Sequence, residues 1–170
     1  MIFSTLIIKL VSQKPTLRNS LYYVAFYKGR KSGTGIKPTM FRLLDWITRK
    51  VTHGIYSHCE LVYKIDDSQY RCFSSSYRDG GVRTKIMVLD AESWDLVPIE
   101  MEEEDIRNMN WFINTYTGDK YDLWGALGIK IPFIREHSDK WFCSEVVAGA
   151  LLMPRAYRYS PNSLYEVLTK

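Results

Sequence analysis

Cys143, in the stretch KWFCSEVVAGALL (residues 140–152), is the side chain best placed to act as a nucleophile. We predict a helix here with Cys143 in its first turn, where unpaired N–H groups and the helix dipole stabilise a thiolate. Helical spacing puts one apolar face on Cys143, Val146, Val147, Ala150 and Leu151. A cysteine on such a face is usually a packing residue. Two interpretations therefore stand, a core residue and an activated thiol.

The start of this helix has a second possible use. Ser138 or Asp139 is expected to cap it. The backbone amide at or near Cys143 would then face an oxyanion formed beside the sulfur. This arrangement would suit acyl transfer to a thiol.

A thiolate nucleophile needs a base within hydrogen-bond reach, and the chain has three histidines. His137 is in a polar loop, and His53 ends a predicted helix. His58 lies in the predicted strand YSHCELVY, where alternation places His58 and Glu60 on one face and Cys59 on the other. We expect a helix to cover the face of His58 and Glu60. A covered polar pair is either a hydrogen-bonded structural device or a site.

Other chemistry is less favoured by the spacing. Cys59, Cys72 and Cys143 are an odd number without a short paired spacing, which predicts reduced thiols and not a disulfide framework. No Cys-x-x-Cys or His-x-x-x-His pair suggests zinc. The stretch GRKSGTG lacks the ending of a phosphate-binding loop and is interpreted as a mobile loop near a cleft. We therefore expect no metal and no cofactor.

The stretch YRDGGVR contains an Asp-Gly pair that is typical of a hairpin turn. A role in substrate binding is the second interpretation, for Arg78 or Arg83 and, with them, Asp79. Tyr121 is a third candidate for substrate binding. With Asp122 it would stabilise the cleft, although core packing and helix capping explain both residues equally well.

The pattern of apolar residues predicts an α+β fold, with a largely antiparallel sheet packed against helices, in a single domain of residues 1–170. Four consecutive strands between residues 56 and 99 suggest an antiparallel meander. An earlier strand covers residues 21–27. Helices are expected at residues 38–51, in the stretch that starts with EMEEEDI and stops at Gly118, and at residues 121–129, 140–152 and 160–168.

Composition limits the class of protein. The 170 residues are 46% hydrophobic and 25% charged, as in a packed globular domain. The net charge of +4 comes from scattered basic residues, which favours an ordinary solvated surface over a polyanion or membrane partner, and no nucleic-acid partner is expected. Lys9 interrupts the first apolar run, which is too short to span a membrane, so we expect a soluble, intracellular protein. A run of this kind could also serve as an edge strand or a docking arm.

The stretches YSHCELVY, YDLWGALG and WFCSEVVAGAL together resemble the circularly permuted branch of the NlpC-type papain-like cysteine hydrolases, the YiiX-like group. The resemblance covers residues 22–168 and implies a circularly permuted papain-like fold. It makes Cys143 the nucleophile and His58 the general base. The third position departs from the group, because CFSSSYRDGG offers Ser74, Ser75 and Ser76 where an acid is usual. Glu60 or Asp79 would substitute, or the site would work as a dyad or be inactive.

Three functions follow as expectations. The first is a cysteine peptidase or amidase that cleaves a peptide or cell-wall-type amide through a thioester. The second is a lipid acyltransferase or thioesterase with the same chemistry. The third is a non-catalytic papain-like module that binds or builds part of a larger assembly, such as a phage particle. The expected location is the cytoplasm of a bacterium or phage-infected cell, with the virion as the alternative.

Overall fold

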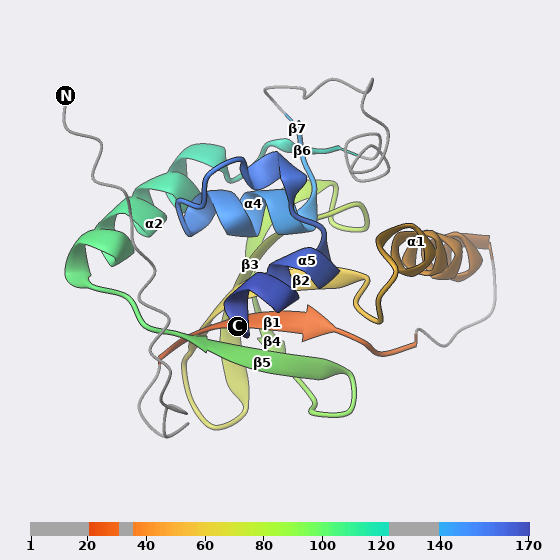
Figure 1. The fold of residues 1–170 in the computed structure, drawn as a ribbon, viewed down its shortest axis with the longest axis horizontal. Helices are drawn as coiled ribbons and strands as arrows, with labels where there is room; N and C mark the ends of the chain where they lie inside the picture. Colours follow the sequence, from red (N-terminus) through yellow and green to blue (C-terminus); the bar gives the residue numbers. More distant parts are fainter. Residues whose placement is uncertain (1–20, 31–35, 123–139) are drawn as a thin grey trace.

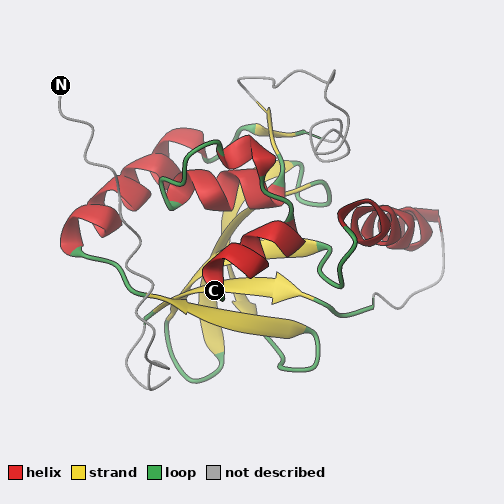
Figure 2. Cartoon of the chain, viewed as in Figure 1, coloured by secondary structure: helices red, strands yellow, loops and turns green. Residues whose placement is uncertain are grey.

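A curled, mostly antiparallel sheet with helices on one side forms an α+β fold (Figures 1 and 2). The computed structural model describes residues 21–30, 36–122 and 140–170. The strands are β1 (Tyr22–Tyr27), β2 (His58–Lys64), β3 (Gln69–Ser76), β4 (Gly81–Val88), β5 (Trp94–Ile99), β6 (Lys120–Tyr121) and β7 (Lys140–Trp141). The helices are α1 (Ile36–Thr52), α2 (Glu103–Tyr116), α4 (Cys143–Ala150), α5 (Pro161–Leu168) and a 3₁₀ turn, η1 (Ala156–Arg158).

The strand order is β5-β1-β2-β3-β4-β6-β7. Strands β2, β3 and β4 form the predicted antiparallel meander. The prediction was wrong for the fourth strand, because β5 pairs with β1 at the opposite edge and not with β4. Propensity identifies a strand, whereas its partner depends on the edge left open by the rest of the sheet.

The connection between β4 and β5 requires the sheet to curl. In a flat sheet the two strands would lie four spacings apart, about 19 Å. The link, residues 89–93, would reach about 20 Å if it were fully extended. It is not extended, because the N–H of Trp94 donates to the Asp90 carbonyl across a turn at 3.0 Å. The edges of β4 and β5 are therefore brought toward each other.

The curl gives the sheet two different apolar faces. One face carries Val24, Phe26 and Leu61 and packs against helices α2, α4 and α5 (Figure 1). The other face closes on itself, and there Ala25 and Val62 contact side chains of neighbouring strands. Alternation along β1 and β2 thus serves two cores, one under the helices and one inside the curl.

Local signals place several helix ends as predicted. Three acids occupy the first turn of α2, and Gly118 follows the helix with a φ of 102° that favours glycine. The Ser160 hydroxyl accepts from the Ser163 N–H at 3.1 Å, with Pro161 as the first residue of α5. His53 follows α1 in the left-handed region, with a φ of 52°, so its interpretation as a terminus residue is confirmed.

Two of the predicted helices have other bounds in the structure or lie partly outside the described residues. The helix predicted for residues 140–152 begins at Cys143, because Lys140 and Trp141 form β7. Tyr121 belongs to β6, and the remainder of the helix predicted for residues 121–129 lies outside the described residues beyond Asp122. The apolar start of the chain and most of the GRKSGTG stretch are also outside them.

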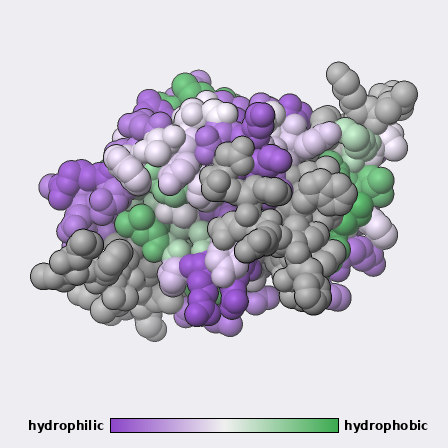
Figure 3. All heavy atoms as spheres, turned by 90° about the horizontal axis from the view of Figure 1, so that it is seen from above, coloured by the Kyte–Doolittle hydropathy of each residue, from purple (hydrophilic) through white to green (hydrophobic). Residues whose placement is uncertain are grey.

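Helix α1 lies apart from the layer of α2, α4 and α5, at one side of the molecule (Figure 1). Among its described side chains none is fully buried. The molecular surface on the side where α1 lies includes a hydrophobic area (Figure 3). None of the helices in the described ranges is both long and apolar enough to cross a membrane.

Candidate active site

Helix α4 presents Cys143 at its first position. Phe142 is the N-cap residue, and its N–H donates to the Glu145 carboxylate at 3.4 Å. The predicted caps Ser138 and Asp139 come too early in the chain for this helix, because it starts only after β7. Cys143 is 6% exposed. The sulfur therefore lies at the positive end of a helix that is buried on nearly every side.

Strand β2 presents His58 at its first position, with Cys59 and Glu60 following on opposite faces. Cys59 is fully buried in the core under α4, as predicted. The expectation that a helix covers the face of Glu60 was wrong, because the carboxylate points toward Arg83 of β4 inside the curl. Alternation separates two faces, and only the curl decides what each face meets.

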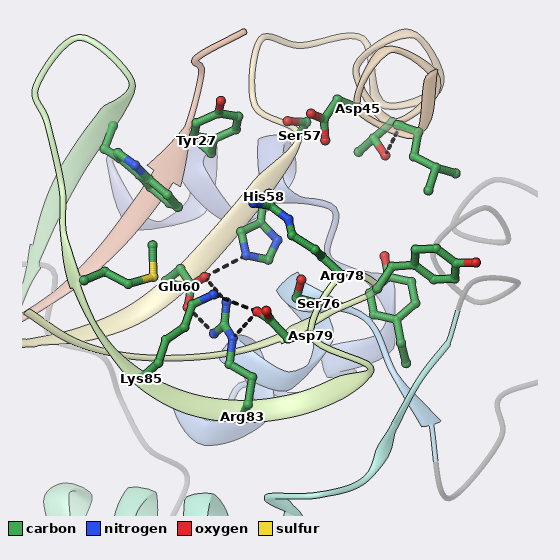
Figure 4. A pocket seen from close by; sticks show the side chains of 16 residues that line it. Tyr27, Asp45, Ser57, His58, Glu60, Ser76, Arg78, Asp79, Arg83 and Lys85 are labelled. Carbon is green, nitrogen blue, oxygen red and sulfur yellow. Dashed lines mark hydrogen bonds and ion pairs between the residues drawn. The ribbon is translucent and has the colours of Figure 1, made fainter. Parts of the chain in front are cut away.

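Glu60 binds both the imidazole and a guanidinium (Figure 4). Its Oε1 lies 2.9 Å from Nε2 of His58, and Arg83 donates to its two oxygens at 2.5 Å each. Arg83 also donates from Nε to Asp79 at 2.7 Å, and the Lys85 ammonium lies 2.8 Å from Asp79. The fully buried carboxylate is thus held by two partners and cannot turn away from the ring.

Ser74 explains how Arg83 reaches Glu60 across an intervening strand. The registers of β2 with β3 and of β3 with β4 place Glu60, Ser74 and Arg83 in one row on the same face. Ser74 is fully buried and donates its hydroxyl to the Cys59 carbonyl at 2.7 Å. Because serine is small, the long arginine side chain has room to pass over it. Ser74 is therefore a packing residue below the ion pair and does not contact the imidazole as the third catalytic group.

The ion pair changes the pKa values of its members. Burial alone would raise the pKa of Glu60, but hydrogen bonds from His58 and Arg83 lower it to about 2. Burial likewise opposes the charge on Arg83, and Glu60 raises the pKa of the guanidinium above its usual value. Both groups are therefore ionised across the neutral range.

Cys143 and His58 lie close enough to shift each other's pKa. A hydrogen bond from the Cys59 thiol and attraction to His58 lower the pKa of Cys143 well below its usual value, against the effect of burial. Burial would lower the pKa of His58, but Cys143 and then Glu60 raise it to about 9. Nε2 is held by Glu60, which leaves Nδ1 for the sulfur. This pair favours thiolate and imidazolium at neutral pH.

The sequence did not predict the roles that Cys59 and Arg83 have here, and it indicated Arg83 only as a possible substrate-binding residue. Burial raises the pKa of the Cys59 thiol, which keeps it protonated and able to donate to Cys143. Cys59 had been recognised only as core. Arg83 lies on the same face as Glu60, but the signal exists only once the strand registers are known.

A cavity of about 290 Å³ opens beside this network (Figure 4). His58, Glu60 and the three predicted substrate-binding residues, Arg78, Asp79 and Tyr121, all line it. Cys143 is not among the lining residues, and it is only 6% exposed. Further lining comes from Tyr27, Leu44, Asp45, Thr48, Ser57, Ser76, Tyr77, Arg83, Lys85, Met87 and Trp94.

The lining residues differ in how they are held. Asp79 is fixed by its contacts with Arg83 and Lys85, and its pKa is lowered to about 2 by them despite partial burial. Burial and then the nearby Cys143 raise the pKa of Tyr121, so the phenol stays protonated. Asp79 therefore supports the network, while Tyr121 contributes a protonated phenol to the lining of the cavity.

Within residues 21–30, 36–122 and 140–170, no three histidine, cysteine, aspartate or glutamate side chains come together as a metal site. Neither a protein-family model nor a curated protein sequence matches the chain. The functional argument therefore rests on the residues themselves.

Proposed function

We propose that this protein is a cysteine hydrolase that cleaves an amide through a thioester formed on Cys143. The supporting observation is the chain of contacts behind the sulfur. His58 lies next to Cys143, Glu60 binds the far nitrogen of the ring, and Arg83 holds Glu60. Nucleophile, base and orienting acid in this order are what such chemistry needs. We also propose membership of the circularly permuted NlpC-type papain-like hydrolases.

The reaction would start from the thiolate and imidazolium. The Cys143 sulfur attacks the substrate carbonyl, and N–H groups at the start of α4 face the oxyanion. His58 gives its Nδ1 proton to the leaving nitrogen, and the C–N bond breaks to leave a thioester. His58 then takes a proton from water, which attacks the thioester and releases the acid with the thiolate restored.

Glu60 would serve this cycle as an orienting group. Its hydrogen bond to Nε2 fixes the ring with Nδ1 toward the sulfur, and its charge stabilises the imidazolium. Arg83 keeps Glu60 ionised, so Glu60 does not take the proton from the ring. Asp79 would contribute indirectly, because it accepts a hydrogen bond from Arg83 and so holds the guanidinium in place.

The substrate we propose is a peptide or cell-wall-type amide. The cavity beside His58 offers tyrosine and tryptophan side chains for an extended group, and charged groups at Arg78 and Asp45 for polar ends. A lipid acyl substrate attacked by the same thiolate is the alternative within this class. The cytoplasm of a bacterium or phage-infected cell, or a virion, is the proposed setting.

The accessibility of the sulfur favours a second candidate function. Cys143 is 6% exposed and does not line the cavity, whereas the His58 side chain is 21% exposed and does. A non-catalytic module, such as one part of a phage particle, would use the cavity for binding and keep the thiol as a core residue. The reactivity of the thiol separates the two functions.

The test is to alkylate the purified protein with iodoacetamide between pH 5 and 10 and to map the labelled cysteines by mass spectrometry. We expect Cys143 to react already below about pH 7. In His58→Ala the thiol pKa should return toward about 8.5, so labelling at pH 6.5 should fall about a hundredfold. Cys72 is the internal control, because burial raises its thiol pKa to about 12.

The opposite result would support the binding module. Cys143 would then react slowly, with a rate that rises only near the pKa of a free thiol, and His58→Ala would leave the profile unchanged. A His53→Ala variant is the matched control, because His53 lies at the end of α1 and does not line the cavity.

A further inference from the structure

Helix α1 carries an apolar and basic face that points away from the protein. We define the outer face of α1 as Met40, Arg42, Leu43, Trp46 and Lys50, all of them exposed. Leu43 is 53% exposed and Trp46 57%. Large apolar side chains this accessible on one helix suggest a partner.

Spacing organises these side chains into two rows. Arg42, Trp46 and Lys50 follow one another at intervals of four, so the indole lies between two cationic side chains. Met40, Leu43 and Trp46 follow at intervals of three and make the apolar row. The two rows share Trp46, which places apolar and basic groups side by side on the outer face.

The inner face of α1 adds no described side chain to either hydrophobic core. Polar contacts attach the helix instead. Arg49 donates to the Gly29 carbonyl at 2.7 Å, and Asn162 donates to the Thr52 hydroxyl at 2.6 Å. Leu44, Asp45 and Thr48 line the cavity beside His58. The helix is thus the wall between the cavity and the exposed apolar row.

We propose that the outer face of α1 binds the surface of an anionic lipid bilayer. An amphipathic helix with tryptophan and aliphatic groups beside arginine and lysine lies in the membrane interface, with its apolar side chains in the acyl boundary and its cations at the headgroups. The outer face contains two basic residues, Arg42 and Lys50, and no acidic residue, so its charge is opposite to that of the lipid. Hydrophobic surface is visible on this side in Figure 3. The proposal does not depend on the reactivity of Cys143.

Membrane binding through the outer face of α1 would also determine where the cavity lies. Because α1 lines the cavity with one face and would contact lipid with the other, docking would hold the cavity close to the membrane surface. A substrate displayed at that surface would reach His58 over a short distance.

The test is co-sedimentation of the full chain with vesicles of phosphatidylcholine alone and of equal parts phosphatidylcholine and phosphatidylglycerol. We expect binding to the anionic vesicles only, weakened by salt. Arg42→Gln with Lys50→Gln should weaken the partition about twenty-five-fold, since each basic residue contributes about fivefold. Trp46→Ser should weaken it about tenfold, because the indole no longer enters the interface.

Trp111→Ser is the matched control, because Trp111 on α2 is 63% exposed and is not part of the outer face. It should bind like the wild type, and far-ultraviolet circular dichroism should show all variants folded. The proposal is overturned if the wild type does not co-sediment with anionic vesicles at low salt. It is equally overturned if Trp46→Ser and Trp111→Ser weaken the partition by the same factor. It is also overturned if sedimentation velocity without lipid shows a dimer that Trp46→Ser dissociates, since a second copy then covers this face.

Discussion

Helices α4 and α1 both contribute to the surroundings of His58, but they relate to the rest of the protein in opposite ways. Helix α4 brings Cys143 to the imidazole and is buried on nearly all sides, including Ser144 and Glu145. Helix α1 lines the cavity on the other side of His58 and has no fully buried side chain among those described. One helix is part of the core, and the other is attached to its edge.

The difference shows how the same periodicity serves two purposes. In α4 the tight packing fixes the first turn, so the sulfur is held against His58 and Cys59. In α1 the polar contacts of Arg49 and Thr52 fix the helix while leaving its apolar row outside. Packing in α4 therefore supports reactivity, whereas exposure in α1 supports contact with a partner.

Replacing the thiol on α4 should have the largest effect. We expect Cys143→Ala to lower the hydrolysis of a small activated ester, p-nitrophenyl acetate, about a thousandfold, because the proposed nucleophile is lost. The free energy of unfolding should change by less than about 1 kcal/mol, since alanine fills most of the same space. Cys72→Ala is the control that keeps its activity. Equal loss in both variants would mean that α4 contributes packing alone.

The carboxylate that orients His58 comes next. Glu60→Gln should lower the free energy of unfolding by about 3 kcal/mol at pH 7, because Arg83 keeps its buried charge without this partner. The folded pKa of Glu60, about 2, lies below its ordinary value of 4.5, so the stabilisation is present above pH 4.5 and is lost as the pH falls toward 2. Urea unfolding across this range should show a steeper acid slope in the wild type than in Glu60→Gln, where Asp79 still contributes a slope of its own.

An exposed carboxylate provides the control for that measurement. Glu104→Gln, at the start of α2, should keep both the stability at pH 7 and the acid slope of the wild type. If Glu60→Gln behaves in the same way, the ion pair with Arg83 contributes nothing to folding, and the site is not held as we infer.

A smaller effect should distinguish the packing of the two helices. Val147 on α4 is fully buried in the main core. Val147→Ala should lower the free energy of unfolding by about 2 kcal/mol, because the lost methyl groups leave a cavity that tight packing cannot fill. Chemical denaturation measures this change. A loss below about 0.5 kcal/mol would show that α4 is packed more loosely than its burial indicates.

The smallest effect should come from the outer face of α1. Leu43→Ala should change the free energy of unfolding by less than about 0.5 kcal/mol, because the side chain is already in contact with solvent. The same denaturation experiment applies, with Val147→Ala as the reference. A loss as large as that of Val147→Ala would mean that Leu43 packs in the folded protein, and the contrast between the helices would disappear.

Helix ends, turns and strand faces could be predicted from short segments of the sequence. The acidic first turn of α2, the cap at Ser160 and the hairpin after Ser76 all follow from side chains within a few residues of each site. The opposite faces of Cys59 and Glu60 follow from the period of a strand in the same way. These features depend on backbone geometry that neighbouring residues determine.

The arrangement of these pieces required the tertiary structure. Three features depend on the strand order and on the curl of the sheet. They are the pairing of β5 with β1, the reach of Arg83 over Ser74 to Glu60, and the effect of Cys59 on the pKa of Cys143. Periodicity tells which side chains share a face. What that face meets is decided by segments distant along the chain, because their packing, and not local propensity, settles which surfaces are buried together.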